Sequence, residues 1–462
     1  MVEPDGTTGP RSGPLSRLLR SLRRLFVRWR TESHPETPRQ DLDEATSRAQ
    51  LKLVLEAFGK DGVGGLPVDD GHGKDERYLC HPQRVLVGAE DVSRLDEFLD
   101  QRKDGYRDRG RVLGELVGDL VTYELPARVD SGAADVHRSL AEIDEALGEG
   151  VVRPDHIVHI AVRGTGKMCP ATEPEIPLGR GPSPALTKNM SAGKGVRVSV
   201  VDTGWYAPAE TNPESPWLAG GIEGDLETVN PAAIHPYAGH GTFVAGVIRC
   251  LAPATYIEVE GVLTKAGAVY ESAITRELNE ALTDKDEPDI ISISAGAYTR
   301  RDLGLLGFER LAEAHELHEG ESAVLVVAAA GNDSSDRPFW PAAYDWVLSV
   351  GALDPDMTVS DFSNFGDWVD VYAHGRDLVN AYPTGTYTCV EPAHAGEVRS
   401  FTGLAQWSGT SFATPVVTGS IAAYMSEHGV SARAARDAIV AAGVPFTSAV
   451  AGSSVAVGTP FA

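Results

Sequence analysis

The second half of the chain alternates long apolar runs with segments of helical periodicity. The apolar runs, each of which predicts a strand, lie at residues 196–201, 257–263, 289–294 and 324–330. The helical segments are expected from His240 onward, at 271–282, from Ser411 to Ile421 and at 432–442. Buried strands separated by helices are typical of a parallel sheet with crossover helices. We therefore predict an α/β fold, a parallel sheet flanked by helices, over residues 195–462.

Residues 77–170 show a different pattern, in which short strands are interrupted by two helices. Strands are predicted at 84–88, 120–125 and 155–160, and helices at 91–101 and from Ser131 or Asp135 to about Leu147. This arrangement predicts a small α+β domain that precedes the larger one. Residues 171–194 are expected to connect the two.

The first thirty residues carry seven arginines and one apolar stripe. Large apolar side chains recur at helical spacing from Leu15 to Trp29, which predicts a basic amphipathic helix in residues 1–30. Through residues 15–30 this helix suits an anionic membrane surface or an acidic partner, and a solvated extension is the third interpretation. The segment lacks signal-peptide features and is too charged to span a bilayer. Residues 31–76 are predicted to be a linker with one helix near 45–58.

Composition limits the classes of function. The chain has 462 residues, too many for one compact domain, and its net charge of −25 disfavours nucleic acid as a partner. Its cysteines are widely spaced and form no zinc signature: Cys80, Cys169, Cys250 and Cys389. They favour the reduced state, and two disulfides are the alternative for an exported protein. We expect a cytoplasmic location, peripheral to the inner membrane face if the basic helix binds lipid, with secretion left open.

Three short segments supply a carboxylate, an imidazole and a hydroxyl. Asp202 follows the apolar run 196–201, His240 opens a helix within Gly-His-Gly-Thr, and Ser411 lies in Ser-Gly-Thr-Ser-Phe-Ala-Thr-Pro. A serine hydroxyl becomes a nucleophile when an imidazole accepts its proton, and a carboxylate orients the imidazole. The chain order Asp, His, Ser is one of three known triad orders. At these motifs the chain resembles the subtilisin-like serine proteases (subtilases), from about Gly195 to about Gly443.

The resemblance implies a serine endopeptidase. In it Asp202 orients His240, His240 acts as general base and then general acid, and Ser411 attacks the peptide carbonyl. Asn332, which ends the run 324–330 as Ala330-Gly331-Asn332, would donate to the oxyanion together with the backbone N–H of Ser411. The substrate-binding residues implied are Ser294, Ala295 and Gly296 on one wall, with Ala330 and Gly331. Because their small side chains let a peptide backbone approach, they favour peptide bonds over small esters.

The resemblance also implies a role for the small domain. In subtilases a propeptide of this kind acts as internal chaperone and inhibitor until it is cut off, and here the cut is expected near Met168 to Pro177. Self-processing is therefore predicted, and the alternative is a latent or scaffold protein that its N-terminal domain inhibits permanently. Esterase or peptide-ligase activity through the same acyl-enzyme uses identical residues.

Some positions depart from the family pattern or leave choices open. His374 stands where proline is usual and is interpreted as a loop residue, and the segment 381–401 is long enough to overhang the cleft. Asp333 near the rim of the specificity pocket either favours lysine or arginine in the substrate or is a solvated loop carboxylate. Phe339 and Trp340 would instead fill the base of the pocket and favour small or medium side chains. Pro415 is expected in the first turn of its helix. No calcium loop is recognisable, so a structural calcium stays open and no other cofactor is predicted.

Overall fold

The computed structural model describes residues 49, 52–59, 68–69, 75–76, 78–129, 136–160, 172–178, 181–264, 266–283, 287–318 and 324–458. The basic segment 1–30 and the segment 161–170 lie outside these residues, so the predictions made for them stay predictions. Among the helices described, none is long and apolar enough to cross a membrane.

The N-terminal part builds a five-stranded antiparallel sheet in the order β10-β6-β3-β5-β4. Its elements are β3 Cys80–Gly88, α3 Ala89–Gln101, β4 Arg111–Glu115, β5 Leu120–Glu124, α4 Val136–Leu147, β6 Val152–His159 and β10 Ala268–Tyr270. Both helices pack against strands of this sheet, and their apolar side chains form its core with Val85, Val87 and Tyr123. The predicted strands and helices are confirmed, with β3 beginning four residues before Arg84. The edge strand β4 escaped prediction because all of its residues are exposed.

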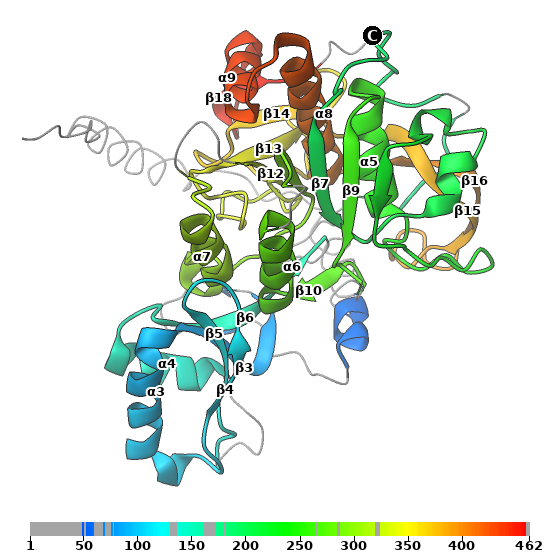
Figure 1. Ribbon diagram of the computed structural model, residues 1–462. Coiled ribbons are helices and arrows are strands. Elements are labelled where there is room, and N and C mark those ends of the chain that lie inside the picture. The colour runs from blue at the N-terminus through cyan, green and yellow to red at the C-terminus, as the bar shows by residue number, and fades with distance from the viewer. Residues whose placement is uncertain are drawn as a thin grey trace, which may run out of the picture. The chain divides into compact units, whose positions relative to one another are not determined.

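The strand β10 is the unexpected member of this sheet. It comes from the chain beyond residue 195, yet it pairs antiparallel with β6, with Val269 opposite Val158. It leads directly into α6, Glu271–Thr283, which contacts β6 as well. Figure 1 shows α6 and its neighbour α7, Leu306–Ala314, beside the N-terminal sheet. One short strand therefore joins the two parts of the molecule through main-chain hydrogen bonds.

The large part contains a nine-stranded sheet, which confirms the predicted parallel α/β fold. Its strand order is β17-β18-β14-β13-β12-β11-β7-β9-β8, and the strands from β14 to β8 are parallel. Their bounds are β7 Arg197–Asp202, β8 Ile222–Gly224, β9 Tyr256–Gly261, β11 Ile290–Ile293, β12 Leu325–Ala329, β13 Val347–Leu353, β14 Val371–His374, β17 Val444–Ser448 and β18 Gly452–Ala456. Strands β13 and β14 were not predicted.

Alternating side chains of the central strands enter two different cores. Ile290 packs with α5, His240–Leu251, and α8, Thr410–His428, whereas its neighbour Ile291 packs with α6 and α7. On β12, Val327 packs in the same core as Ile290, and its neighbour Val326 packs in the same core as Ile291. Helices therefore cover both faces of the sheet, which explains why these strands carry apolar side chains on both faces. The last helix, α9 Ala432–Ala442, has the predicted bounds.

The segment 381–401 lies in a β-hairpin. Strand β15, Leu378–Thr388, pairs antiparallel with β16, Val398–Trp407, and β15 packs against α5. Segment 172–178 runs along the hairpin, with Glu175 and Gln406 exchanging two backbone hydrogen bonds of 2.8 Å. The buried carboxylate of Glu173 accepts hydrogen bonds from the Tyr387 hydroxyl and the Val390 backbone N–H.

Candidate active site

Asp202 and His240 meet where β7 ends and α5 begins. Nδ1 of His240 lies 2.7 and 2.9 Å from the two carboxylate oxygens of Asp202, and both side chains are fully buried. Gly239 precedes the helix with a left-handed backbone (φ +77°), a conformation that costs glycine little. The tight start of α5 therefore points the imidazole at the carboxyl end of the sheet, where Asp202 emerges.

The His240 ring is enclosed by aromatic side chains that flank Ser411. Ring centroids of Trp407 and Phe412 lie 5.5 and 5.2 Å from that of His240. Within the part of the chain described, Nε2 of His240 is buried and has no hydrogen-bond partner. With Nδ1 committed to Asp202, Nε2 is the ring nitrogen that can accept a proton.

Ser411 is the second residue of α8, so the helix begins one residue earlier than predicted. Its Oγ lies 3.4 Å from the carbonyl oxygen of Ser294, while Oγ of Ser294 donates to the Ser411 carbonyl at 2.9 Å. The Ser411 carbonyl needs this donor because Pro415, four residues on, has no N–H to give it. Pro415 is thus inside the helix and not in its first turn, and its missing hydrogen bond is replaced by one from the neighbouring strand end.

Asn332 lies beside the start of the same helix. Its Oδ1 accepts a hydrogen bond of 2.7 Å from the Thr410 backbone N–H, so the nitrogen end of the amide is its donor. Gly331 N–H donates to Oγ1 of Thr410 at 3.1 Å, and the carbonyl of Ala330 accepts from Nδ2 of Asn364 at 2.8 Å. The loop after β12 is thereby fixed against α8, and the predicted residues 330–332 lie at the level of Ser411.

The predicted wall Ser294-Ala295-Gly296 follows β11 and is occupied by the chain itself. The backbone N–H of His159 donates to the Gly296 carbonyl at 2.9 Å, and the Gly296 N–H donates back at 3.1 Å. On the other side, the N–H of Ile160 donates to the carbonyl of Gly267 at 2.8 Å. The end of β6 therefore lies as an extended strand between two segments of the large part.

A match to a known protein family identifies the type of enzyme to which this site belongs. Residues 193–451 match the model of the Subtilase family. The chain belongs to the subtilase family. It is a serine protease of the subtilisin type, as the Asp-His-Ser motifs predicted.

Two sequence relatives agree with this assignment. The Intracellular serine protease of Paenibacillus polymyxa is 33% identical over 51% of this chain and 68% of its own. Thermitase of Thermoactinomyces vulgaris is 31% identical over 54% of this chain and 82% of its own. A solved structure of the prenylagaramide maturation protease PagA matches 55% of this chain and 85% of its own, at 25% identity and a TM-score of 0.40.

One acidic residue near the subtilase triad was missed by sequence reasoning. Glu227 accepts a hydrogen bond of 2.7 Å from the N–H of Gly239, the residue before His240. Burial, with a smaller contribution from the nearby Asp202 carboxylate, raises the pKa of Glu227 to about 8. A lone glutamate in a loop gives no sequence signal, because only the folded chain brings it to the start of α5.

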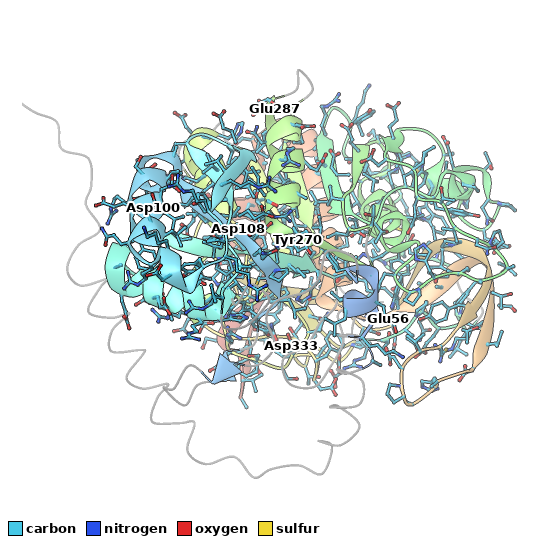
Figure 2. All side chains as sticks on the ribbon, turned by 90° about the horizontal axis from the view of Figure 1, so that it is seen from below. Glu56, Asp100, Asp108, Tyr270, Glu287 and Asp333 are labelled. Carbon is cyan, nitrogen blue, oxygen red and sulfur yellow. The ribbon has the colours of Figure 1, made fainter. Side chains whose placement is uncertain are left out.

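Two residues that the sequence left open, His374 and Asp333, have defined places in the fold. His374 is the last residue of β14 and not a loop residue, and burial lowers its pKa. Asp333, labelled in Figure 2, lies in the loop after β12, is buried and accepts a hydrogen bond of 2.6 Å from the Tyr298 hydroxyl. Its carboxylate is therefore part of an internal network.

The prediction of a structural calcium stays open, whereas three of the four cysteines can be placed in the structure. The described residues contain no cluster of three or more His, Cys, Asp or Glu side chains that could hold a metal ion, and a structural calcium stays a prediction. Cys80, Cys250 and Cys389 are buried free thiols. Because Cys169 would be the only cysteine left, the alternative of two disulfides is wrong.

Proposed function

We propose that this subtilase is an endopeptidase that cleaves peptide bonds through an acyl-enzyme. Ser411 is the nucleophile, His240 removes its proton through Nε2 and later returns it to the leaving amine, and Asp202 holds the imidazole and stabilises its charged form. The buried Asp202–His240 hydrogen bonds support these roles, as does Nε2 of His240, which has no hydrogen-bond partner among the described residues. Proton transfer balances because the base that deprotonates the serine protonates the amine that leaves.

Asn332 and the backbone N–H of Ser411 are proposed to stabilise the oxyanion. Ser411 lies at the N-terminus of α8, where backbone N–H groups have no partner inside the helix and favour negative charge. The Thr410–Asn332 hydrogen bond fixes the amide beforehand, so no reorganisation is needed when the charge develops.

The observation that carries the endopeptidase proposal is the pairing of His159 with Gly296. Two backbone hydrogen bonds between an extended strand and the cleft wall are the mode in which sheet edges bind peptides. An esterase acting on small molecules has no need of such a ladder.

The same pairing supports a specific self-processing site. In an antiparallel ladder, moving two residues forward on one strand moves two residues backward on the other. In a peptide that continues this ladder, the residue two positions after the one at the level of His159 comes opposite Ser294, whose carbonyl is 3.4 Å from Oγ of Ser411. We therefore propose that the chain cuts itself between Ala161 and Val162, upstream of the segment Met168–Pro177 that the sequence indicated. Until then the N-terminal domain acts as an inhibitor.

The test is intact mass over time, with a fluorophosphonate serine probe, for wild type and Ser411→Ala. We expect labelling and a new N-terminus at Val162 in wild type, and neither in the variant. Labelling without any cut would show an active enzyme whose N-terminal domain is not a removable propeptide. A cut at 168–177 would refute the register argument, and absence of both signals would refute the self-processing enzyme in favour of the alternative, a protein that its N-terminal domain keeps latent.

We also propose that the protease acts inside the cell. The name of the Paenibacillus relative and the three buried thiols support this location. The test is fractionation of the producing cells, and recovery of the protein only from the medium would contradict this location. Binding of residues 15–30 to anionic lipid or an acidic partner remains a proposal, and loss of vesicle binding on deleting residues 1–30 is its test.

A further inference from the structure

The ring of Phe339 fills the space between the two predicted walls of the substrate cleft. A Cβ atom added to Gly296 would lie 2.7 Å from Cδ1 of this ring, and one added to Gly331 would lie 3.0 Å from the same atom. Phe339 is 2% exposed. The ring therefore occupies room that side chains on either wall, or a substrate side chain between them, would otherwise use.

The surroundings of Phe339 hold the ring in place. The Tyr298 ring meets it edge-on, with centroids 5.2 Å apart. The Tyr298 hydroxyl donates to Asp333 at 2.6 Å and accepts from Nδ2 of Asn364 at 3.1 Å. The next residue, Trp340, exchanges two backbone hydrogen bonds of 2.7 and 2.9 Å with Ala297. Moving the ring aside would disturb this buried network, so Phe339 acts as a fixed floor.

The strand that lies in the cleft shows which substrate residue would meet this floor. The His159 ring is buried, with its centroid 6.2 Å from that of Phe339. Side chains two residues apart along a strand point to the same face. A substrate residue two positions after the one at the level of His159 would therefore direct its side chain toward Phe339, and that is the residue before the cleaved bond.

We propose that Phe339 restricts the residue before the cleaved bond to small side chains, namely glycine, alanine or serine. The proposal rests on the endopeptidase function and names its substrate class. Ala161, the residue before the proposed self-processing site, belongs to this class. The other specificity considered, for lysine or arginine through Asp333, is disfavoured because that carboxylate is buried and bonded to Tyr298.

The first test compares cleavage of peptides that differ only at this residue, for wild type and Phe339→Ala. Wild type should cleave after alanine at least about 100-fold more efficiently than after phenylalanine or leucine, and the variant should reverse much of this difference, on the scale set by pocket size. Because removing a buried phenylalanine also destabilises the fold, Phe308→Ala, an equally buried residue of α7, is the control. Labelling by the fluorophosphonate probe counts active sites in each sample.

The second test uses the full-length chain as its own substrate. The single variant Ala161→Phe should lose self-cleavage, and the double variant Ala161→Phe/Phe339→Ala should regain it. A variant whose fold was only damaged by Phe339→Ala would not regain self-cleavage. The proposal would be overturned if wild type cleaved after phenylalanine or arginine as efficiently as after alanine. Labelling by the fluorophosphonate probe in the same samples would still support the endopeptidase function. Absence of labelling in wild type would overturn both.

Discussion

At the residue scale, the site depends on groups whose hydrogen-bond partners are fixed before substrate arrives. Nδ1 of His240 is hydrogen-bonded to Asp202, Oδ1 of Asn332 accepts from the Thr410 N–H, and the Ser411 carbonyl accepts from the Ser294 hydroxyl. Each bond holds the residue through an atom that takes no part in the proposed reaction, and so fixes the position of the atom that does. Preorganisation of this kind is the main source of electrostatic catalysis in enzymes.

Glu227 gives a prediction about pH at this scale. Its pKa is about 8 in the folded chain against 4.5 for an ordinary glutamate, so between these values the unfolded chain ionises it while the folded chain keeps the proton. Stability contributed by this group therefore falls as pH rises from about 4.5 to 8. In Glu227→Gln the melting temperature should fall less steeply over this window than in wild type.

The measurement is thermal unfolding of both proteins in a Ser411→Ala background, which prevents processing. Glu214→Gln, at an exposed position, is the control and should follow wild type. Parallel slopes for Glu227→Gln and wild type would show that Glu227 is ionised in the folded protein, and its assigned pKa would be wrong.

At the element scale, the contact between β10 and β6 decides how the N-terminal sheet meets the rest of the chain. The helical residues 52–57 confirm part of the helix predicted at 45–58, and Val54 and Phe58 pack on this junction together with Ile157 and Tyr270. Phe58 meets the Tyr270 ring edge-on at 4.8 Å. This helix is thus part of the contact rather than of a linker.

Phe58→Ala should weaken the junction by about 3 kcal/mol, the usual effect of removing a buried aromatic side chain. In the Ser411→Ala background, backbone amides of β10 and β6 should then exchange hydrogen faster than in the parent. Lys52→Ala on the same helix, where the side chain is 73% exposed, is the matched control. Equal exchange in both variants would mean that the helix contributes nothing to the pairing.

At the scale of the whole molecule, polar and charged groups buried between β6 and the start of α6 join the N-terminal sheet to the large part. The carboxylate of Asp155, on β6, is fully buried and accepts hydrogen bonds from Arg84 and from the backbone N–H and hydroxyl of Ser272 in the first turn of α6. His156 bonds Glu271 at 2.9 Å and accepts from the Arg300 N–H at 3.2 Å. An acid at the start of α6 also faces the positive end of the helix dipole.

Removing one partner of such a network leaves the others buried without compensation. Asp155→Ala in the Ser411→Ala background should therefore lower the free energy of unfolding by about 3 kcal/mol, measured with denaturant. Asp100→Ala, whose carboxylate is 58% exposed in the same sheet domain and is labelled in Figure 2, should change it by less than about 0.5 kcal/mol. Similar losses for the two variants would show that the buried network does not stabilise the assembly of the sheets.

The sequence by itself determined the parallel α/β fold, the family, the central buried strands and the helices that carry the catalytic motifs, and it gave the bounds of α9. These follow from local signals, because apolar runs, helical periodicity and short motifs act over a few residues. It could not determine that β10 joins another sheet, that His159 pairs with Gly296, that Glu227 supports the start of α5 or that Phe339 reaches both cleft walls. Those contacts join segments far apart in the chain, where pairing and burial depend on the packed structure and leave no periodic trace.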